Sequence, residues 1–395
     1  MKSLSVDERK LLIIQGCDIL AYSLASVFVT IFFFSHSTLA TTALFRAVAF
    51  ASMVFFFVLT GRLLKYVSAG TLIKFSLVLG ALYFFLLFFL REQSIRWYVP
   101  LAVLDGCSGG IFWAAFNLYQ YIVSSSERRV AYFGWGQAMF NFAGAVGPAV
   151  GGMVILLAGR TGIGVTGGYT VLFLIVSIIM GITAIIVGKL PAHGSLTFSY
   201  SHLLTHKRTL GWKLVLGQQA LLGLYDVSLG TVTSILLFLI IQSESRLGVI
   251  LTVASLLATL TSIVVTRVLV KYPQSYWIGV FGSAAAIVVF ASQQSIFGVW
   301  LMICISGLTV PFMMTKLSTA YFDALDEAPG TWENKFHMMI ERDGLLGFLR
   351  MASYIILFFV LQGGDQIMIA RTWLFFIPVI PLVIGVLLYA GPRAK

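Results

Sequence analysis

Charged side chains are scarce in this sequence. Asp, Glu, Lys and Arg make up 10% of the 395 residues, whereas apolar and aromatic residues make up 59%. Soluble domains carry about 25% charged residues. A chain so poor in charge cannot cover a surface that faces water on all sides, so its main surroundings must be lipid. An independent soluble domain is therefore excluded.

Cysteine is also rare. Cys17, Cys107 and Cys304 all fall within apolar runs, and the sequence contains no CxxC motif. His202 and His206 lie four residues apart in a polar stretch, and such a lone pair is more often solvated than bound to a metal. We therefore expect no disulfide, no metal site and no cofactor.

Acidic residues are fewer than basic ones, 15 against 26, which leaves a formal net charge of +11. The basic residues are spread in small numbers over the loops and form no stripe with exposed aromatics, so we expect no nucleic-acid partner. Their spacing is typical of cytoplasmic loops of membrane proteins, and it suits contact with anionic membrane lipids.

Long apolar runs, by contrast, occupy most of the chain. A membrane-spanning helix needs about 20 residues. Twelve runs approach or exceed this length: 11–34, 38–61, 70–90, 97–123, 131–158, 168–188, 213–241, 248–270, 277–292, 296–321, 345–362 and 372–390. Because backbone groups in hydrocarbon must bond internally, each run is expected to be a helix. The predicted fold class is an all-α polytopic membrane protein with 12 transmembrane helices.

The distribution of cations predicts the orientation of these helices. With the N-terminus in the cytoplasm, 19 Lys and Arg residues fall in cytoplasmic segments and 5 in outer loops. This bias favours both termini in the cytoplasm and an even number of spans. We expect a multi-pass protein of the bacterial cell (inner) membrane.

A polar connection divides the predicted helices into two sets of six. The expected domains are an N-terminal bundle at 1–190, a cytoplasmic linker at 191–212 and a C-terminal bundle at 213–395. Duplicated halves are common in secondary transporters, which bind their solute near the midplane between the halves. We therefore predict two pseudo-twofold six-helix bundles.

A weak internal repeat supports this division. Gly16-Cys-Asp18 in the first predicted span resembles Gly223-Leu-Tyr-Asp226 in the seventh. Such a pattern is suggestive of duplication rather than specific for it.

Five ionisable residues lie inside the predicted spans: Asp18, Asp105, Asp226, Arg46 and Arg350. A charge at the centre of a membrane helix costs about 2.5–3.5 kcal/mol on insertion scales, so each needs a reason. Asp226, Asp105 and Asp18 are candidates for proton coupling. Arg46 and Asp105 lie at similar predicted depth, so a structural ion pair is an alternative for these two. Arg46 and Arg350 are candidates for charge partners or for contacts with an anionic substrate.

Polar and aromatic residues at midplane depth extend the candidate site. Amides and aromatics of this kind line cavities for organic solutes, although each of them can instead serve ordinary packing between helices. The cavity candidates are Trp113, Asn117, Tyr121, Gln137, Asn141, Gln218 and Gln219.

Small residues gather in the fifth predicted span. They let a neighbouring helix approach closely, and a proline within the span bends it. Such a helix can act as a pivot and seal between two halves, with generic close packing as the alternative. The residues of this motif are Gly134, Gly147, Pro148, Gly151 and Gly152.

The twelve spans and this motif together resemble the major facilitator superfamily. In the antiporter motif of that superfamily a further glycine stands where this chain has Ala143, and the resemblance implies export. Two positions depart from the superfamily pattern. Lys65 stands where an acidic gate residue is expected, and Asp105 replaces the arginine found four residues before Gly109 in drug exporters.

A narrower likeness is to YqgE-type permeases of Gram-positive bacteria. Four segments carry it: Phe112-Trp-Ala-Ala-Phe-Asn117, Arg129-Val-Ala-Tyr-Phe-Gly134, Ala145-Val-Gly-Pro148 and Glu341-Arg-Asp-Gly-Leu-Leu-Gly-Phe-Leu-Arg350. That branch is expected to carry Arg-Glu and Gly-Arg pairs in the last segment. Here the first is inverted and the second is loosened.

The sequence favours a secondary active transporter of a small solute, with proton-coupled export (antiport) by alternating access. It is expected to act as a monomer and not as an enzyme. A flippase for lipids or lipid-linked sugars on the same fold is an alternative. A membrane-embedded enzyme is less favoured, because its only candidate site is the acidic stretch 323–343.

Overall fold

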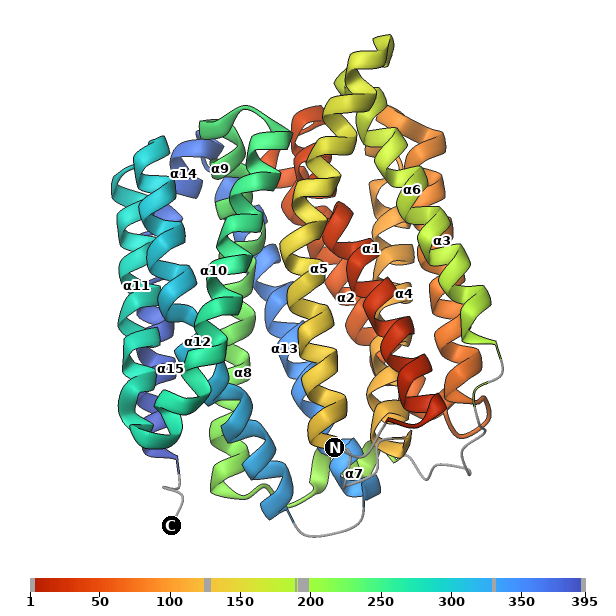
Figure 1. Cartoon of the computed structure of the whole chain (residues 1–395), viewed down its shortest axis with the longest axis vertical. Coiled ribbons are helices and arrows are strands. Elements are labelled where there is room, and N and C mark those ends of the chain that lie inside the picture. The colour runs from red at the N-terminus through yellow and green to blue at the C-terminus, as the bar shows by residue number, and fades with distance from the viewer. Residues whose placement is uncertain (1–3, 124–128, 189, 191–198, 329–331, 392–395) are drawn as a thin grey trace. The chain divides into compact units, whose positions relative to one another are not determined.

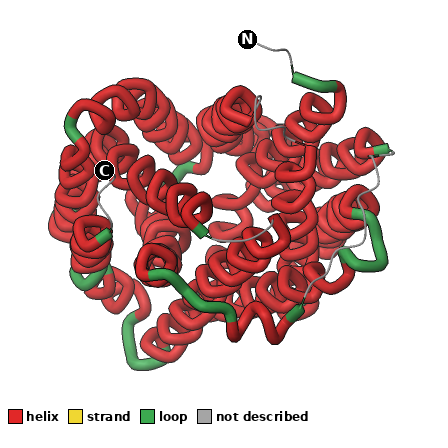
Figure 2. The backbone as a smooth tube through the Cα atoms, turned by 90° about the horizontal axis from the view of Figure 1, so that it is seen from below, coloured by secondary structure: helices red, strands yellow, loops and turns green. Residues whose placement is uncertain are grey.

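The computed structural model describes residues 4–123, 129–188, 190, 199–328 and 332–391. Over this part of the chain the backbone forms helices joined by short loops and contains no strand (Figure 2). Ten helical segments there are long and apolar enough to cross a membrane. One of them, Trp135–Val187, comprises two helices, and the shorter apolar helix Val379–Ala390 adds another. Counted in this way, the apolar helices of the described residues number twelve, and the predicted all-α fold class is confirmed.

The chain forms two compact units. Unit 1 comprises Met1–Thr38, Phe45–Ser199 and Ser243–Thr252. Unit 2 comprises the three remaining stretches, Leu39–Leu44, Tyr200–Gln242 and Val253–Lys395. The domain limits proposed from the sequence stay predictions.

Unit 1 contains most of the first six spans. Here α1 packs against α5 and α6, while α3 packs against α4 and α6 (Figure 1). A capping box starts α1, because Ser5 and Glu8 each accept the backbone N–H of the other. The helices of this part are α1 (Val6–His36), α2 (Leu39–Leu63), α3 (Ala69–Leu90), η1 (Arg91–Ile95), α4 (Tyr98–Val123), α5 (Arg129–Ala158), η2 (Gly159–Ile163) and α6 (Gly164–Val187).

Aromatic side chains fill the core of unit 1. The ring of Phe32 meets that of Phe173 edge-on, with centroids 5.4 Å apart, and this contact joins α1 to α6. Phe33 stacks on Phe45 with centroids 4.2 Å apart, which joins α1 to α2. All four rings are buried. Aromatic pairs stabilise a core by about 0.5–1.5 kcal/mol beyond the area they bury, so these contacts fix α1 at the centre of the unit.

Unit 2 holds most of the later helices. Within it, α8 packs against α13 and α15, and α11 packs against α12 and α15. The helices of this part are α7 (Tyr200–Thr205), α8 (Leu210–Val227), η3 (Ser228–Thr233), α9 (Ser234–Ile241), α10 (Glu244–Lys271), η4 (Pro273–Ser275), α11 (Tyr276–Ser292), α12 (Ile296–Glu327), α13 (Trp332–Leu361), α14 (Gln366–Trp373) and α15 (Val379–Ala390).

One span of unit 2 is irregular near its middle. The helices α8, η3 and α9 run on without a break over Leu210–Ile241, and η3 is a π-helical turn. Such turns are rare and occur often at functional sites. The turn follows Asp226 by one residue, and the hydroxyl of its first residue, Ser228, accepts a hydrogen bond of 2.9 Å from the Trp373 indole.

Candidate functional site

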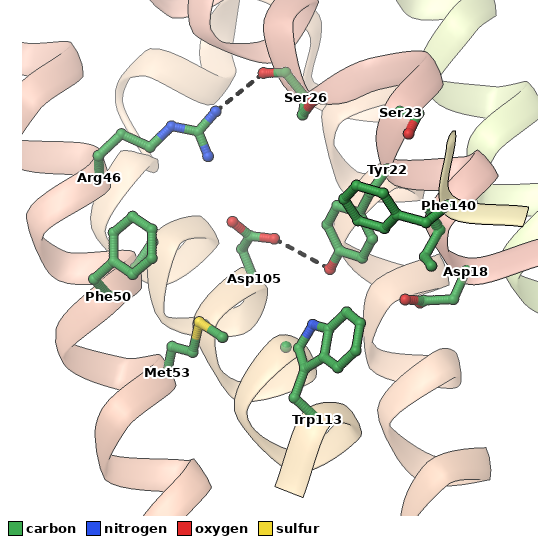
Figure 3. A pocket seen from close by; sticks show the side chains of 14 residues that line it. Asp18, Tyr22, Ser23, Ser26, Arg46, Phe50, Met53, Asp105, Trp113 and Phe140 are labelled. Carbon is green, nitrogen blue, oxygen red and sulfur yellow. Dashed lines mark hydrogen bonds between the residues drawn. The ribbon is translucent and has the colours of Figure 1, made fainter. Parts of the chain in front are cut away.

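A cavity of about 260 Å³ lies inside unit 1 and is bordered by α1, α2, α4 and α5. We call it the unit 1 cavity (Figure 3). It is slightly smaller than the pockets of about 300–1,000 Å³ that hold drug-sized ligands. Its ionisable side chains come from three different helices, and aromatic rings complete the wall. The lining includes Asp18, Tyr22, Ser23, Ser26, Arg46, Phe50, Met53, Asp105, Trp113 and Phe140.

The backbones of α2 and α4 meet directly beside the cavity. A Cβ atom added to Gly106 would lie 2.1 Å from the carbonyl oxygen of Ala49, and one added to Gly110 would lie 2.4 Å from that of Met53. Only residues without a Cβ allow such an approach. The two glycines are four residues apart and so share one face of α4. This contact sets the distance between Asp105, on α4, and the side chains of α2.

Asp105 and Arg46 face the same cavity without touching each other. Tyr22 donates a hydrogen bond of 3.4 Å to Oδ1 of Asp105, and Figure 3 shows Arg46 on the other side of this carboxylate. Arg46 instead donates from Nη2 to the Ser26 carbonyl at 3.1 Å and to the Thr30 hydroxyl at 2.6 Å. Among the described residues no ion pair joins the two side chains.

Asp18 is the most enclosed acid of the cavity. Only 3% of its surface is exposed. It makes no hydrogen bond or ion pair with any residue that the structure describes. A buried carboxylate ion without such partners is very unfavourable, whereas the neutral acid is much easier to bury. A proton on this group would remove that penalty.

Asp226 has a partner that the sequence did not reveal. Arg350, on α13, donates from Nε to Oδ2 of Asp226, on α8, at 3.1 Å, and its Nη2 reaches the same oxygen. The two helices lie close here, since a Cβ added to Gly223 would be 2.8 Å from the Leu346 carbonyl. The pair lies wholly within unit 2. Asp226 is thus an ion-paired acid, in contrast to Asp18.

Of the predicted cavity residues in the first half, one lines the unit 1 cavity and three make hydrogen bonds within their own helices. Trp113 lines the unit 1 cavity. Gln137 donates to Asn141 at 2.9 Å along one face of α5, and Asn117 accepts from Gln120 at 3.4 Å on α4. These three amides therefore have hydrogen bonds within their own helices.

The two glutamines of the second half are buried in α8, with Gln218 2% and Gln219 7% exposed. The side chain of Tyr121 lies outside the described residues. Sequence reasoning missed Tyr22, although a signal was present. Tyr22 follows Asp18 by four residues and so shares its face of the helix.

Two residues of the predicted motif in α5, Gly147 and Gly151, pack against α1. A Cβ added to Gly147 would lie 2.5 Å from Cβ of Ser23, and one added to Gly151 would lie 2.3 Å from the Leu24 carbonyl. The small residues thus bring α5 against the segment of α1 that carries Tyr22 and Ser26. The motif therefore helps to build the unit 1 cavity.

Two further residues of the motif, Pro148 and Gly152, contact Ser243–Thr252, which also belongs to unit 1. A Cβ on Gly152 would lie 2.5 Å from the Glu244 carbonyl, and one on Gly248 would lie 2.2 Å from that of Pro148. The surroundings of Gly134, the first residue of the motif, lie outside what the structure describes. The contact between α5 and the start of α10 is thus backbone against backbone.

The comparisons with known proteins agree with this architecture. The sequence profile of the Major Facilitator Superfamily matches residues 11–331. A protein of Geobacillus stearothermophilus known as the uncharacterized protein in sodM 3'region is 25% identical over 168 residues, which cover 42% of this chain and 76% of that protein.

The uncharacterized protein YqgE of Bacillus subtilis (strain 168) is 23% identical over 242 residues, or 60% of this chain. The match spans only 55% of the length of YqgE. It confirms the resemblance to YqgE-type proteins that the sequence motifs indicated. Neither relative has an assigned activity.

Among solved structures, a bacterial homologue of the human lysosomal transporter Spinster, in an inward-facing and unoccupied conformation, has the same fold. Its TM-score is 0.70 at 12% identity, and the match covers 97% of this chain and 96% of that one. At this identity the likeness concerns the fold alone. Because the profile covers most of the sequence and the fold is that of a solved transporter, the chain belongs to the Major Facilitator Superfamily of membrane transporters and is not an enzyme.

Proposed function

We propose that this transporter exports a small solute in exchange for protons, and that the unit 1 cavity holds both coupling acids. The observation that carries the proposal is the presence of two carboxyl groups, Asp18 and Asp105, in the wall of one small cavity. Ionisable groups inside a membrane protein are expensive and mark ion or proton pathways. Two of them at one cavity support a site where protonation and solute binding affect each other.

The arrangement favours these two acids over Asp226 as coupling residues. The Asp226 carboxylate has a guanidinium partner in Arg350, which stabilises its charged form. Asp18 has no such partner among the described residues, and Asp105 has one long hydrogen bond of 3.4 Å from Tyr22. Groups without a fixed counter-ion gain or lose a proton with less rearrangement. Asp226 and Arg350 are assigned to holding α8 and α13 together.

Arg46 connects the protonation state of Asp105, ionised or neutral, to the width of the cavity. Its guanidinium is held by the Ser26 carbonyl and the Thr30 hydroxyl, and it lines the same cavity as Asp105. When Asp105 is ionised, attraction draws Arg46 toward it and narrows the cavity. When a proton neutralises Asp105, Arg46 keeps its hydrogen bonds to Ser26 and Thr30 of α1, and the cavity is open to solute. Protonation and access are coupled in this way through one side chain.

Export is proposed from the motif of α5. In the superfamily that motif is associated with exporters, and here Gly147 and Gly151 give α5 the close packing on α1 that the motif implies. The cell membrane of a bacterium is the proposed location, since both curated relatives are bacterial. The proposed partners are the solute, protons and membrane lipids, and the proposed state is a monomer.

Proton flux in proteoliposomes tests the proposal. The purified protein is reconstituted with a trapped pH-sensitive dye, a pH gradient is imposed, and small organic cations, anions and neutral solutes are offered one at a time. We expect at least one class to evoke proton movement in the wild type. Asp105→Asn and Asp18→Asn should abolish that movement, because neither amide can carry the proton.

The matched control is Asp323→Asn. Asp323 is an exposed aspartate of unit 2, so its variant should behave as the wild type. Normal solute-evoked proton flux in both cavity variants would show that these acids do not couple transport. Movement of a labelled lipid in the absence of any soluble solute would favour the flippase alternative instead.

A further inference from the structure

A second cavity, of about 220 Å³, lies in unit 2 and is rich in basic residues. We call it the unit 2 cavity. Three consecutive basic side chains, His206, Lys207 and Arg208, line it together with the start of α8, the residue that follows α12 and part of α13. The remaining lining residues are Thr209, Trp212, Ala328, Asn334 and Met338. Among the residues that the structure describes, none of those lining this cavity is acidic.

A partly buried carboxylate holds the basic wall in place. Glu341, on α13, accepts from Nε of Arg208 at 2.5 Å and from the Trp212 indole at 2.8 Å. Nε2 of His206 lies 3.2 Å from the same carboxylate. The side chain of Glu341 is 13% exposed. One acid thus joins α13 to α8 and to the segment that precedes α8, so the cationic groups have defined positions before any ligand arrives.

The charge of the wall stays positive after this acid is counted. Glu341 supplies one negative charge, against the positive charges of Lys207 and Arg208 and that of His206 when it is protonated. Lys207 is exposed and makes no ion pair within the described part of the chain. The ion pair with Glu341 therefore accounts for the presence of Arg208 in the cavity wall, but it does not account for the presence of Lys207.

The first turn of α8 adds to the positive potential. Thr209 is the N-cap of this helix, and its side chain accepts the backbone N–H of Trp212. The amino end of a helix carries a partial positive charge and favours anions. Asn334, on α13, adds an amide to the lining. Helix terminus, lysine, guanidinium and amide are the groups that bind phosphate oxygens in proteins.

We propose that the unit 2 cavity binds a phosphate group, carried either by an anionic phospholipid or by a soluble phosphate. The volume of the cavity suits a headgroup rather than a drug-sized molecule, whose pockets measure about 300–1,000 Å³. Basic pockets between membrane helices bind anionic lipid headgroups. The site is separate from the unit 1 cavity in residues and in chemistry, so it does not depend on the proposed coupling mechanism.

Two probes test the site on the full-length protein in phosphatidylcholine nanodiscs. The first is phosphatidylglycerol, whose retention is measured by native mass spectrometry. The second is inorganic phosphate, whose binding is measured as a rise in melting temperature. Lys207→Gln removes a cation from the wall without touching the Glu341 cluster. We expect this variant to retain phosphatidylglycerol about fivefold less than the wild type, the effect of one lysine near an anionic surface.

Lys74→Gln is the control, because Lys74 is an exposed lysine of unit 1 and the charge change is identical. Asn334→Leu is a second cavity variant, which keeps the test valid if Lys207→Gln folds poorly. Lipid retention lost in the cavity variants alone supports a lipid headgroup. A rise in melting temperature with phosphate, lost in the same variants, supports a soluble phosphate. Equal binding of both probes by wild type, cavity variants and control would overturn the proposal.

Discussion

Substitution of Gly106 by alanine tests the contact between α2 and α4 on which the candidate site depends. The added Cβ would lie 2.1 Å from the Ala49 carbonyl oxygen, 2.7 Å from Cβ of Ser52 and 2.8 Å from the Met53 nitrogen. A carbon atom normally stays about 3.3–3.6 Å from a carbonyl oxygen. Two of the three neighbours are backbone atoms, which cannot rotate away. The helices must therefore separate by more than about 1 Å.

Gly109 offers a matched control on the same helix. A Cβ added there would meet only Sδ of Met53, at 3.9 Å, which is an ordinary contact. Alanine also stabilises a helix interior by about 1 kcal/mol relative to glycine. Gly109→Ala should therefore be neutral or slightly stabilising. Gly106→Ala gains the same helix stability, but the added Cβ overpacks the contact between α2 and α4. Such overpacking lowers stability by about 1–3 kcal/mol and occasionally more.

The assay is thermal unfolding in detergent, followed by tryptophan fluorescence, with both variants measured beside the wild type. We expect Gly106→Ala to melt several degrees lower than Gly109→Ala. Gly110→Ala should resemble Gly106→Ala, because its Cβ would lie 2.4 Å from the Met53 carbonyl. If Gly106→Ala and Gly109→Ala melt at the same temperature, α2 and α4 do not meet as described and the geometry of the unit 1 cavity is wrong.

Further substitutions test three other contacts. Asp226→Asn or Arg350→Gln alone should lower stability by about 1.5–3 kcal/mol, the range for hydrogen bonds to charged groups. The double variant should lose less than the sum, as a double-mutant cycle in thermal melts will show. Glu341→Ala leaves an indole and a guanidinium without their acceptor and should lower the melting temperature, with Glu341→Gln intermediate. Gly248→Ala should destabilise the protein, because its Cβ would lie 2.2 Å from the Pro148 carbonyl; a melt equal to that of wild type would contradict this contact.

The helical spans were predictable from the sequence because the requirement for internal backbone hydrogen bonds in lipid leaves few alternatives. Asp18 and Asp105 were also predictable as candidate site residues, since a carboxyl group in an apolar run is conspicuous. The residues that contact them could not be predicted. Depth along each helix suggested a pair between Arg46 and Asp105, but pairing also depends on how each helix is rotated. The structure turns Arg46 toward α1, where Ser26 and Thr30 accept its hydrogen bonds.

The remaining gaps have a similar cause. Asp226 and Arg350 are 124 residues apart, and no local pattern connects them. Glu341 lies near the end of a polar segment, where its contacts with Arg208 and Trp212 arise only once α7, α8 and α13 are assembled. The unit 2 cavity was invisible for the same reason, because its wall comes from three separate parts of the chain.

The glycine contact between α2 and α4 has a consequence for the way the transporter moves. Helices whose backbones touch over a full turn, as at Gly106 and Gly110, cannot slide or tilt against each other without breaking several close contacts at once. They must travel as one rigid body during the transport cycle. The spacing of the Arg46 and Asp105 main chains is then constant, and any change in their attraction comes from side-chain rotation. A change in the protonation of Asp105 therefore acts through rotation of the Arg46 side chain, while α2 keeps its position relative to α4.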